Sequence, residues 1–236
     1  GQKLSPKGRV SLIDTQAATE RATQRGRGAV SNKTGRFEKE TRFAFDDGWD
    51  TIEQDAARIE TLVMPETART VITFNRSPDI SFDRTINPYR GCEHGCIYCF
   101  ARPSHAFHGL SAGLDFESRL FYKTNAIRQL EWELSRPGYV CRPIALGMNT
   151  DAYQPIERTY KMTRQVLEML AAHNHPVSLL TKSALIQRDI DLLAPMAEKG
   201  LVRAGVSITT LDRALSRKME PRAATPQRRL ETVRAL

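Results

Sequence analysis

The sequence predicts an α/β fold built on a parallel sheet. From about residue 68 onward, short apolar runs alternate with amphipathic helical windows, and three successive runs begin at residues 143, 177 and 202. Parallel strands need a crossover of a dozen or more residues, which is usually helical. The spacing therefore predicts successive βα units that form a parallel sheet or barrel.

The first predicted strand and helix lie on either side of a cysteine-rich segment. Thr85–Tyr89 is predicted as a strand that runs directly into this segment. Leu120–Leu134 has apolar residues at helical spacing, with Lys123 and Arg128 at solvent-facing positions, and this pattern predicts an amphipathic helix. Arg136-Pro137-Gly138 is predicted to end this helix.

Three more strands and three more helices are predicted in alternation. The strands are short apolar runs, at Pro143–Met148, Val177–Leu180 and Val202–Ile208. The helices are Arg158–His173, Ile190–Lys199 and a last one that opens at Thr225-Pro226. Gly200 is a favourable stop for the second helix. Threonine is a favoured N-cap and proline a favoured first helical residue, which supports the last assignment.

The chain divides by composition into three parts: residues 1–45, 46–67 and 68–236. The first part holds ten Lys and Arg against four Asp and Glu, most of the net charge of +8, and is rich in Gly, Ser, Thr and Gln. We predict a basic, poorly ordered leader, followed by a connecting segment and a folded core. The run Arg25-Gly26-Arg27-Gly28 leaves two interpretations open, a solvated tail or an electrostatic arm for nucleic acid.

The overall composition is that of an ordinary globular protein. Apolar residues make up 40% and charged residues 26% of the 236 residues. The sequence contains no apolar stretch of the roughly 18 residues that a membrane span needs, and no signal peptide opens it. We therefore expect no membrane association and a location in the reducing cytoplasm, where thiols stay available for metal.

Three cysteines within eight residues are the most informative motif. Cys92, Cys96 and Cys99 have the spacing C-x3-C-x2-C. Three thiolates on one loop can bind three irons of an iron–sulfur cluster and leave the fourth iron open to a small molecule. A structural zinc site needs four ligands, so a Cys3His site that uses His94, His105 or His108 stays open as the alternative. Cys141 lies 42 positions after Cys99 without a neighbouring cysteine, and a disulfide within the run is the poorest explanation.

This cysteine run, with Tyr98 before its last cysteine, resembles the signature of the radical S-adenosylmethionine (radical SAM) superfamily. The flanking residues, Asn87 to Cys92, Tyr98 to Arg102 and Ser104-His105, resemble more narrowly the branch related to spore photoproduct lyase. The resemblance implies a [4Fe–4S] cluster on the three thiolates and S-adenosylmethionine (SAM) on the fourth iron. It also implies a partial (β/α)6 barrel of the TIM type. Only four strands can be counted before the sequence stops at Leu236, so we expect a barrel truncated at its C-terminus.

The expected site residues follow from the barrel rule, by which catalytic groups lie at the carboxyl ends of strands. Polar residues follow each of the last three predicted strands. The resemblance implies that Thr150 meets the methionine part of SAM, with Asp151 beside it as an acceptor. It further implies that Lys182 is the basic residue after the third strand and that Ser207 lies near the ribose or carboxylate. Tyr98 is expected to pack against the cofactor.

The resemblance implies an enzyme that cleaves SAM reductively to a 5′-deoxyadenosyl radical and receives electrons from a flavodoxin or ferredoxin. Its substrate is open, with nucleic acid as a candidate of the lyase type. One departure concerns Met148, which stands where spore photoproduct lyases place a cysteine that returns a hydrogen atom to the product. A thioether carries no transferable hydrogen, so repair by that route is not expected. The alternative function is a non-catalytic module, stabilised by zinc or iron–sulfur, that binds nucleic acid through the leader.

Overall fold

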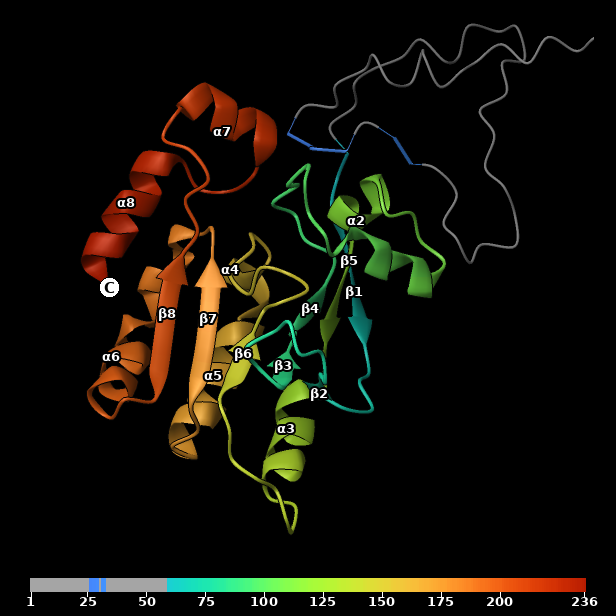
Figure 1. The fold of residues 1–236 in the computed structure, drawn as a ribbon. Coiled ribbons are helices and arrows are strands. Elements are labelled where there is room, and N and C mark those ends of the chain that lie inside the picture. The colour runs from blue at the N-terminus through green and yellow to red at the C-terminus, as the bar shows by residue number, and fades with distance from the viewer. Residues whose placement is uncertain (1–25, 30, 33–58) are drawn as a thin grey trace, which may run out of the picture.

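The computed structural model describes residues 26–29, 31–32 and 59–236. Its centre is a five-stranded sheet in the order β2-β3-β6-β7-β8 (Figure 1). Four strands are parallel: β3 (Arg84–Ile86), β6 (Ile144–Leu146), β7 (Val177–Thr181) and β8 (Val202–Val206). The edge strand β2 (Ile72–Phe74) runs antiparallel to β3. The predicted α/β class with a parallel sheet is confirmed, and β6, β7 and β8 are the last three strands expected from the sequence. The strand predicted over Thr85–Tyr89 is divided, because Thr85 and Ile86 belong to β3 whereas Tyr89 belongs to β4 (Tyr89–Arg90) of a second sheet.

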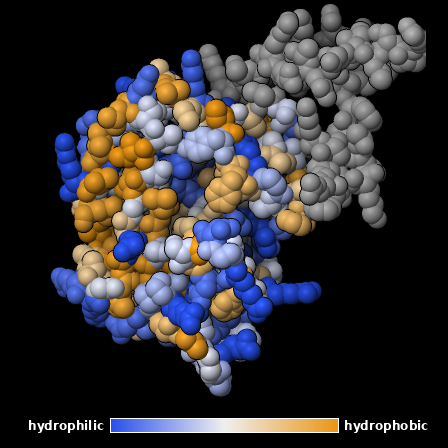
Figure 2. Space-filling view, in the orientation of Figure 1, coloured by the Kyte–Doolittle hydropathy of each residue, from blue (hydrophilic) through white to orange (hydrophobic). Residues whose placement is uncertain are grey.

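Helices cover one face of this sheet. α5 (Met162–Ala172) contacts both α3 (Ala126–Leu134) and α6 (Ile190–Glu198), and α5 lies behind β6 and β7 in Figure 1. Val166, Leu167 and Leu170 of α5 are fully buried in the core. Each such side chain stabilises the folded state by about 1.5–3 kcal/mol through burial. The opposite face is more open: Figure 2 shows apolar residues gathered over β7 and β8, where Leu180 is exposed.

A second, three-stranded sheet corrects one prediction. Its order is β1-β5-β4, formed by Leu62–Glu66, Arg119–Lys123 and Tyr89–Arg90. Residues 120–123, predicted as the start of a helix, belong to β5, and Lys123 is buried instead of solvated. The helix α3 begins only at Ala126. The parallel partner β1 lies 57 residues earlier in the chain, and pairing at that distance overrides the local helical pattern.

The helix predicted over Arg158–His173 is divided in two. α4 (Glu157–Tyr160) ends at Lys161, which has a left-handed φ of 50°, and α5 starts at Met162. The carboxylate of Glu157 is fully buried and accepts hydrogen bonds from the backbone N–H groups of Thr163 (2.9 Å) and Arg164 (3.3 Å). These donors belong to the first turn of α5, so Glu157 caps the new helix and stabilises the break.

Five shorter elements complete the described fold. α8 (Pro226–Ala235) confirms the last predicted helix, and the Thr225 hydroxyl accepts from the backbone N–H of Arg228 (3.4 Å). α7 (Arg213–Met219), which was not predicted, is capped by Asp212. The other three elements surround the cysteine loop and β7: a 3-10 helix η1 (Arg102–His108), α2 (Leu114–Ser118) and a 3-10 helix η2 (Ala184–Asp189).

A small part of the predicted leader contacts the core. Arg27 is 8% exposed, and its guanidinium donates to the backbone oxygens of Glu117 and Ile59 and to the Thr61 hydroxyl. This arginine is therefore held inside the protein and is not free to contact phosphates. The rest of the predicted leader, and residues 46–58 of the connecting segment, lie outside the described residues. Within the described part of the chain, no helix is long and apolar enough to cross a membrane.

Candidate active site

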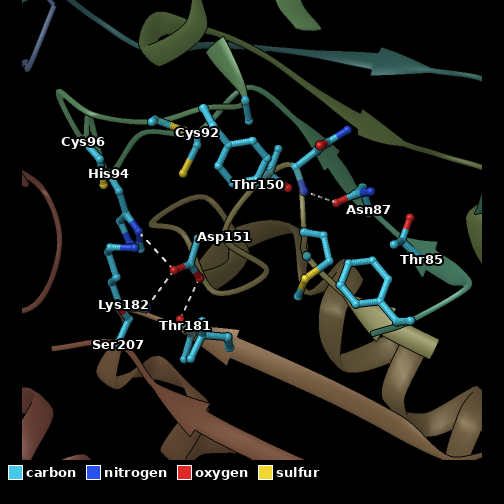
Figure 3. A pocket seen from close by; sticks show the side chains of 18 of the residues that line it. Thr85, Asn87, Cys92, His94, Cys96, Thr150, Asp151, Thr181, Lys182 and Ser207 are labelled. Atoms are coloured by element: carbon cyan, nitrogen blue, oxygen red, sulfur yellow. Dashed lines mark hydrogen bonds and ion pairs between the residues drawn. The ribbon is translucent and has the colours of Figure 1, made fainter. Parts of the chain in front are cut away.

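A cavity of about 520 Å³ opens at the carboxyl ends of the parallel strands. Its wall includes all three cysteines of the motif and the residues that follow β6, β7 and β8. Figure 3 shows side chains from the cysteine loop and from these strand ends pointing into one space. Seven of the eight predicted site residues line this cavity: Cys92, Cys96, Cys99, Thr150, Asp151, Lys182 and Ser207.

The cysteine loop follows β4 and is held by buried polar side chains. Gln154 is fully buried; its amide oxygen accepts from the backbone N–H of Glu93 (2.9 Å), and its amide nitrogen donates to the backbone oxygen of Gly91 (3.0 Å). Cys92 donates its N–H to the backbone oxygen of Phe116 (2.9 Å). The loop is thus fixed to the turn after β6 and to α2 before any cofactor binds.

Glu117 fixes the other side of the loop. Its fully buried carboxylate accepts from the Arg102 guanidinium and from the backbone N–H groups of Gly28 (2.9 Å) and Ala29 (2.8 Å). Arg102 in turn donates to the backbone oxygen of Cys96 (2.8 Å). The sequence did not predict the role of Glu117, because its partners lie 15 to 89 positions away and no local motif marks them.

The chemistry of the three thiols fits a metal cofactor. All three cysteines are free of disulfides. Burial raises the pKa of the Cys92 thiol well above its usual range, an effect to which the Asp151 charge adds. Burial also raises the pKa of Cys96 to about 11, although the nearby Lys182 charge acts in the opposite direction. Buried thiols of this kind become thiolates when a metal replaces their protons.

The same geometry bears on the zinc alternative. Among residues 26–29, 31–32 and 59–236, no three His, Cys, Asp or Glu side chains are placed to share a single metal ion. A cluster does not require such convergence, because each thiolate binds a different iron. The histidines considered as a fourth zinc ligand have protein neighbours: His94 Nδ1 lies 3.3 Å from Asp151 Oδ2, and His105 Nε2 lies 2.8 Å from the backbone oxygen of Arg119. The donor set therefore fits an iron–sulfur cluster better than zinc.

Asp151 joins the cysteine loop to β7. Its Oδ1 accepts from the Thr181 hydroxyl (2.6 Å) and its Oδ2 from the backbone N–H of Lys182 (2.8 Å), with His94 on the other side (Figure 3). Burial alone would raise the pKa of Asp151, but His94, Thr181 and Lys182 outweigh it and lower the pKa to about 2. Both oxygens already have protein partners, so the structure supports a positioning role for Asp151, and direct contact with SAM stays a prediction.

Replacing Asp151 by alanine is expected to lower the free energy of unfolding by about 3 kcal/mol, because several buried donors lose a charged acceptor at once. Urea unfolding followed by circular dichroism measures this change. Asp191→Ala is the control, since that carboxylate is exposed and pairs with Arg164 at the surface; it should change stability far less. Equal effects of the two substitutions would show that the Asp151 contacts do not hold the site together.

Three further predicted residues present polar groups to the cavity. The Thr150 hydroxyl is buried and has no hydrogen-bond partner among the described residues. Within the same residues, the Lys182 ammonium makes no ion pair and lies 5.8 Å from the centre of the Tyr98 ring. Ser207 donates its backbone N–H to Thr181 (2.8 Å), which places it beside β7. Met148 also lines the cavity, at the position where the sequence departs from the lyase pattern.

Tyr98 is the predicted residue that does not line this cavity. Its ring is half-exposed beside Lys182, and its hydroxyl bonds to Glu220 and Thr209. Glu220 is buried and also accepts from Arg229, and these contacts outweigh burial to lower the pKa of the Glu220 carboxyl. Tyr98 thus connects the cysteine loop to the segment between α7 and α8, a contact that the sequence did not predict.

A cavity at the carboxyl edge of a parallel α/β sheet, lined by three free thiols, is the arrangement typical of cofactor-binding α/β proteins. The chain belongs to the radical SAM superfamily, whose family model matches residues 86–236. Membership implies a [4Fe–4S] cluster and SAM as cofactors.

Two similar proteins carry the name uncharacterized protein. The chain is 41% identical to one of Mycobacterium tuberculosis over 157 residues, covering 66% of this chain and 46% of the relative. It is 28% identical to one of Methanocaldococcus jannaschii over 151 residues, covering 64% and 54%. The chain therefore spans about half the length of these relatives.

Solved structures show the same fold. Spore photoproduct lyase complexed with dinucleoside spore photoproduct has a TM-score of 0.51 and 17% identity, with 73% of this chain and 47% of the lyase covered. A variant of the lyase with the same compound gives a TM-score of 0.51 and 17% identity, over 73% and 46%. At this identity the likeness shows the fold alone.

Proposed function

We propose that this radical SAM enzyme holds a [4Fe–4S] cluster on Cys92, Cys96 and Cys99 and binds SAM in the adjoining cavity. The observation that carries the proposal is the convergence of three free thiols with polar groups from three successive strand ends on one cavity. The chemistry supplied by a bound cluster is one-electron reduction of the SAM sulfonium, which yields methionine and a 5′-deoxyadenosyl radical.

The polar residues of the cavity match the groups of SAM. The Lys182 ammonium can pair with the carboxylate, and the unpartnered Thr150 hydroxyl can bond to the methionine part. Ser207 supplies a hydroxyl for the ribose or carboxylate. Asp151 orients the Lys182 backbone and the His94 side of the cysteine loop, so its role is to keep these groups in place. Met148 and Leu180 give the same space an apolar part of its wall.

The electron donor is proposed to be a flavodoxin or ferredoxin, which are common one-electron donors. Nucleic acid is proposed as the substrate class, on the strength of the fold shared with a lyase bound to a dinucleoside product. Because Met148 occupies the cavity wall, hydrogen return by a cysteine at this place is not part of the proposal.

The experiment is anaerobic loading with iron and sulfide, reduction with dithionite, and chromatographic detection of SAM products. We expect 5′-deoxyadenosine and methionine to form in equal amounts, and only in the reduced, loaded protein. A loaded and reduced protein that forms neither product would refute the proposal. A colourless protein with stoichiometric zinc would instead support the non-catalytic module.

A further inference from the structure

A second cavity, of about 250 Å³, lies beside the first. The two cavities share four wall residues, which are Thr85, Asn87, Asn149 and Thr150. The rest of the second wall comes mainly from Thr70 before β2 and from β2, β4, β5 and η1, and it is mostly polar. None of these remaining residues belongs to the cofactor cavity, so the second cavity is a separate compartment that adjoins it.

Lys123 is the unusual residue of this compartment. It is 6% exposed and lines the cavity, and within the described part of the chain its ammonium has no ion pair or hydrogen bond. Two carboxylates, those of Glu66 and Glu133, lie near it, but both already have other partners. Glu66 pairs with Arg90 at 2.6 Å, and Glu133 accepts from two backbone N–H groups of the segment before and within β2, at 2.8 Å each.

The Lys123 side chain is buried, but its ammonium nitrogen is not one of the fully buried polar atoms that lack a partner, so the charged group faces the cavity. Charged groups held in this way are found mostly at functional sites. Burial, with a smaller effect of the Arg90 charge, lowers the pKa of Lys123 to about 8, so the group stays mostly protonated at neutral pH. The cavity also holds the Arg90 guanidinium, which bonds to Glu66 through Nε. The residues that line this compartment therefore include two cations and no carboxylate.

We propose that this second cavity binds a phosphate group of the substrate, with Lys123 as its main charge partner and Arg90 as the second. The threonine hydroxyls of Thr70 and Thr73 line the same space and can donate to further oxygens. A phosphate offers more acceptor oxygens and more charge than a carboxylate, which suits a site with two cations and several hydroxyls. As a statement about the substrate, this inference rests on the proposed function, whereas phosphate binding itself can be tested without it.

Because the two cavities share part of their wall, a phosphate bound in the second cavity would lie next to the cofactor cavity. A phosphate held at Lys123 would direct its ester group past Thr85 and Asn149 toward the cavity that contains the three cysteines. The substrate class is therefore a phosphate ester, of which a nucleotide unit is one example. The phosphate anchors the molecule outside the cofactor cavity and leaves the esterified part inside it.

The test is calorimetric titration of the full chain with four probes: inorganic phosphate, thymidine monophosphate, thymidine and acetate. It is run before and after loading with iron and sulfide, so that failure of cluster binding and failure of phosphate binding are separate results. We expect both phosphates to bind, thymidine monophosphate more tightly, and thymidine and acetate to bind far more weakly. Acetate binding as tight as phosphate would overturn the assignment to phosphate.

The decisive variant is Lys123→Met, which keeps an unbranched side chain shorter by one atom and removes the charge. We expect phosphate affinity to fall by roughly 10- to 100-fold, since a charge-assisted contact is lost. The temperature of unfolding should rise or stay constant, because a buried unpaired charge is removed. Lys199→Met is the control: Lys199 is exposed and bonds to Asn174, away from the cavity, so its substitution should leave affinity unchanged.

Two outcomes overturn the proposal: wild-type protein that binds neither phosphate, or Lys123→Met protein that binds phosphate as tightly as the wild type. If the variant does not fold, acylation of Lys123 in the wild-type protein decides the question by mass spectrometry. Protection of Lys123 by phosphate, with Lys199 unprotected, supports the site. Equal modification with and without phosphate refutes it.

Discussion

Alanine at Cys92, Cys96 or Cys99 is expected to abolish retention of the iron–sulfur cluster. In the proposed cluster each thiolate would bind one iron, and the three sulfurs come from a loop that Gln154 and Glu117 hold in place. Loss of one ligand therefore leaves a second iron open, and the loop cannot move to replace it. Iron and sulfide content after anaerobic loading and gel filtration, together with visible absorption, measures the effect.

Cys141→Ala is the matched control for these variants. Cys141 is exposed and precedes β6, at the amino end of the strands, whereas the cysteine loop lies at their carboxyl ends. Its substitution should leave iron content and absorption unchanged. Loss of the cluster in this variant, or full retention in any of the other three, would contradict the assignment of ligands.

Gly91→Ala is expected to have the second largest effect. Gly91 precedes Cys92 and has a φ of +72°, and a Cβ atom there would lie 2.5 Å from Leu120 Cδ2 and 2.8 Å from the backbone oxygen of Phe116. The left-handed backbone costs about 1 kcal/mol for alanine, and the collision adds about 2 kcal/mol. We expect the free energy of unfolding to fall by about 3 kcal/mol in urea, and cluster retention to fall with it because Cys92 is displaced.

Gly200→Ala separates backbone strain from the collision. Gly200 has a φ of +68°, but a Cβ atom there meets nothing within 4 Å. This control should lose only about 1 kcal/mol and keep the cluster. Equal losses of stability in the two variants would mean that close packing around Gly91 does not set the position of the cysteine loop.

The parallel sheet and much of the site could be predicted because local patterns encode them. The apolar runs that became β6, β7 and β8 are bounded by polar turns, and the polar groups of the site follow directly after them. The cysteine motif is a local signal as well, since its ligands lie within eight residues. Neither prediction needed knowledge of contacts between distant segments.

The remaining features depend on such contacts. β5 pairs with β1 across 57 residues, so Lys123 is buried, although the helical pattern of the sequence places it on the solvent-facing side. Glu117 meets the backbone of residues 28 and 29, and Glu157 meets Tyr89 and Arg188. Buried carboxylates with distant donors have no sequence periodicity, and this is why neither these anchors nor the second cavity could be predicted.

The central claim is that three cysteines hold a cluster with one iron open to SAM. Electron paramagnetic resonance of the reduced, loaded protein, recorded with and without SAM, tests it most directly. We predict an iron–sulfur signal whose shape changes when SAM is added, because SAM becomes a ligand of the open iron. An identical spectrum in both samples, or a protein that retains zinc and no iron, would contradict the claim.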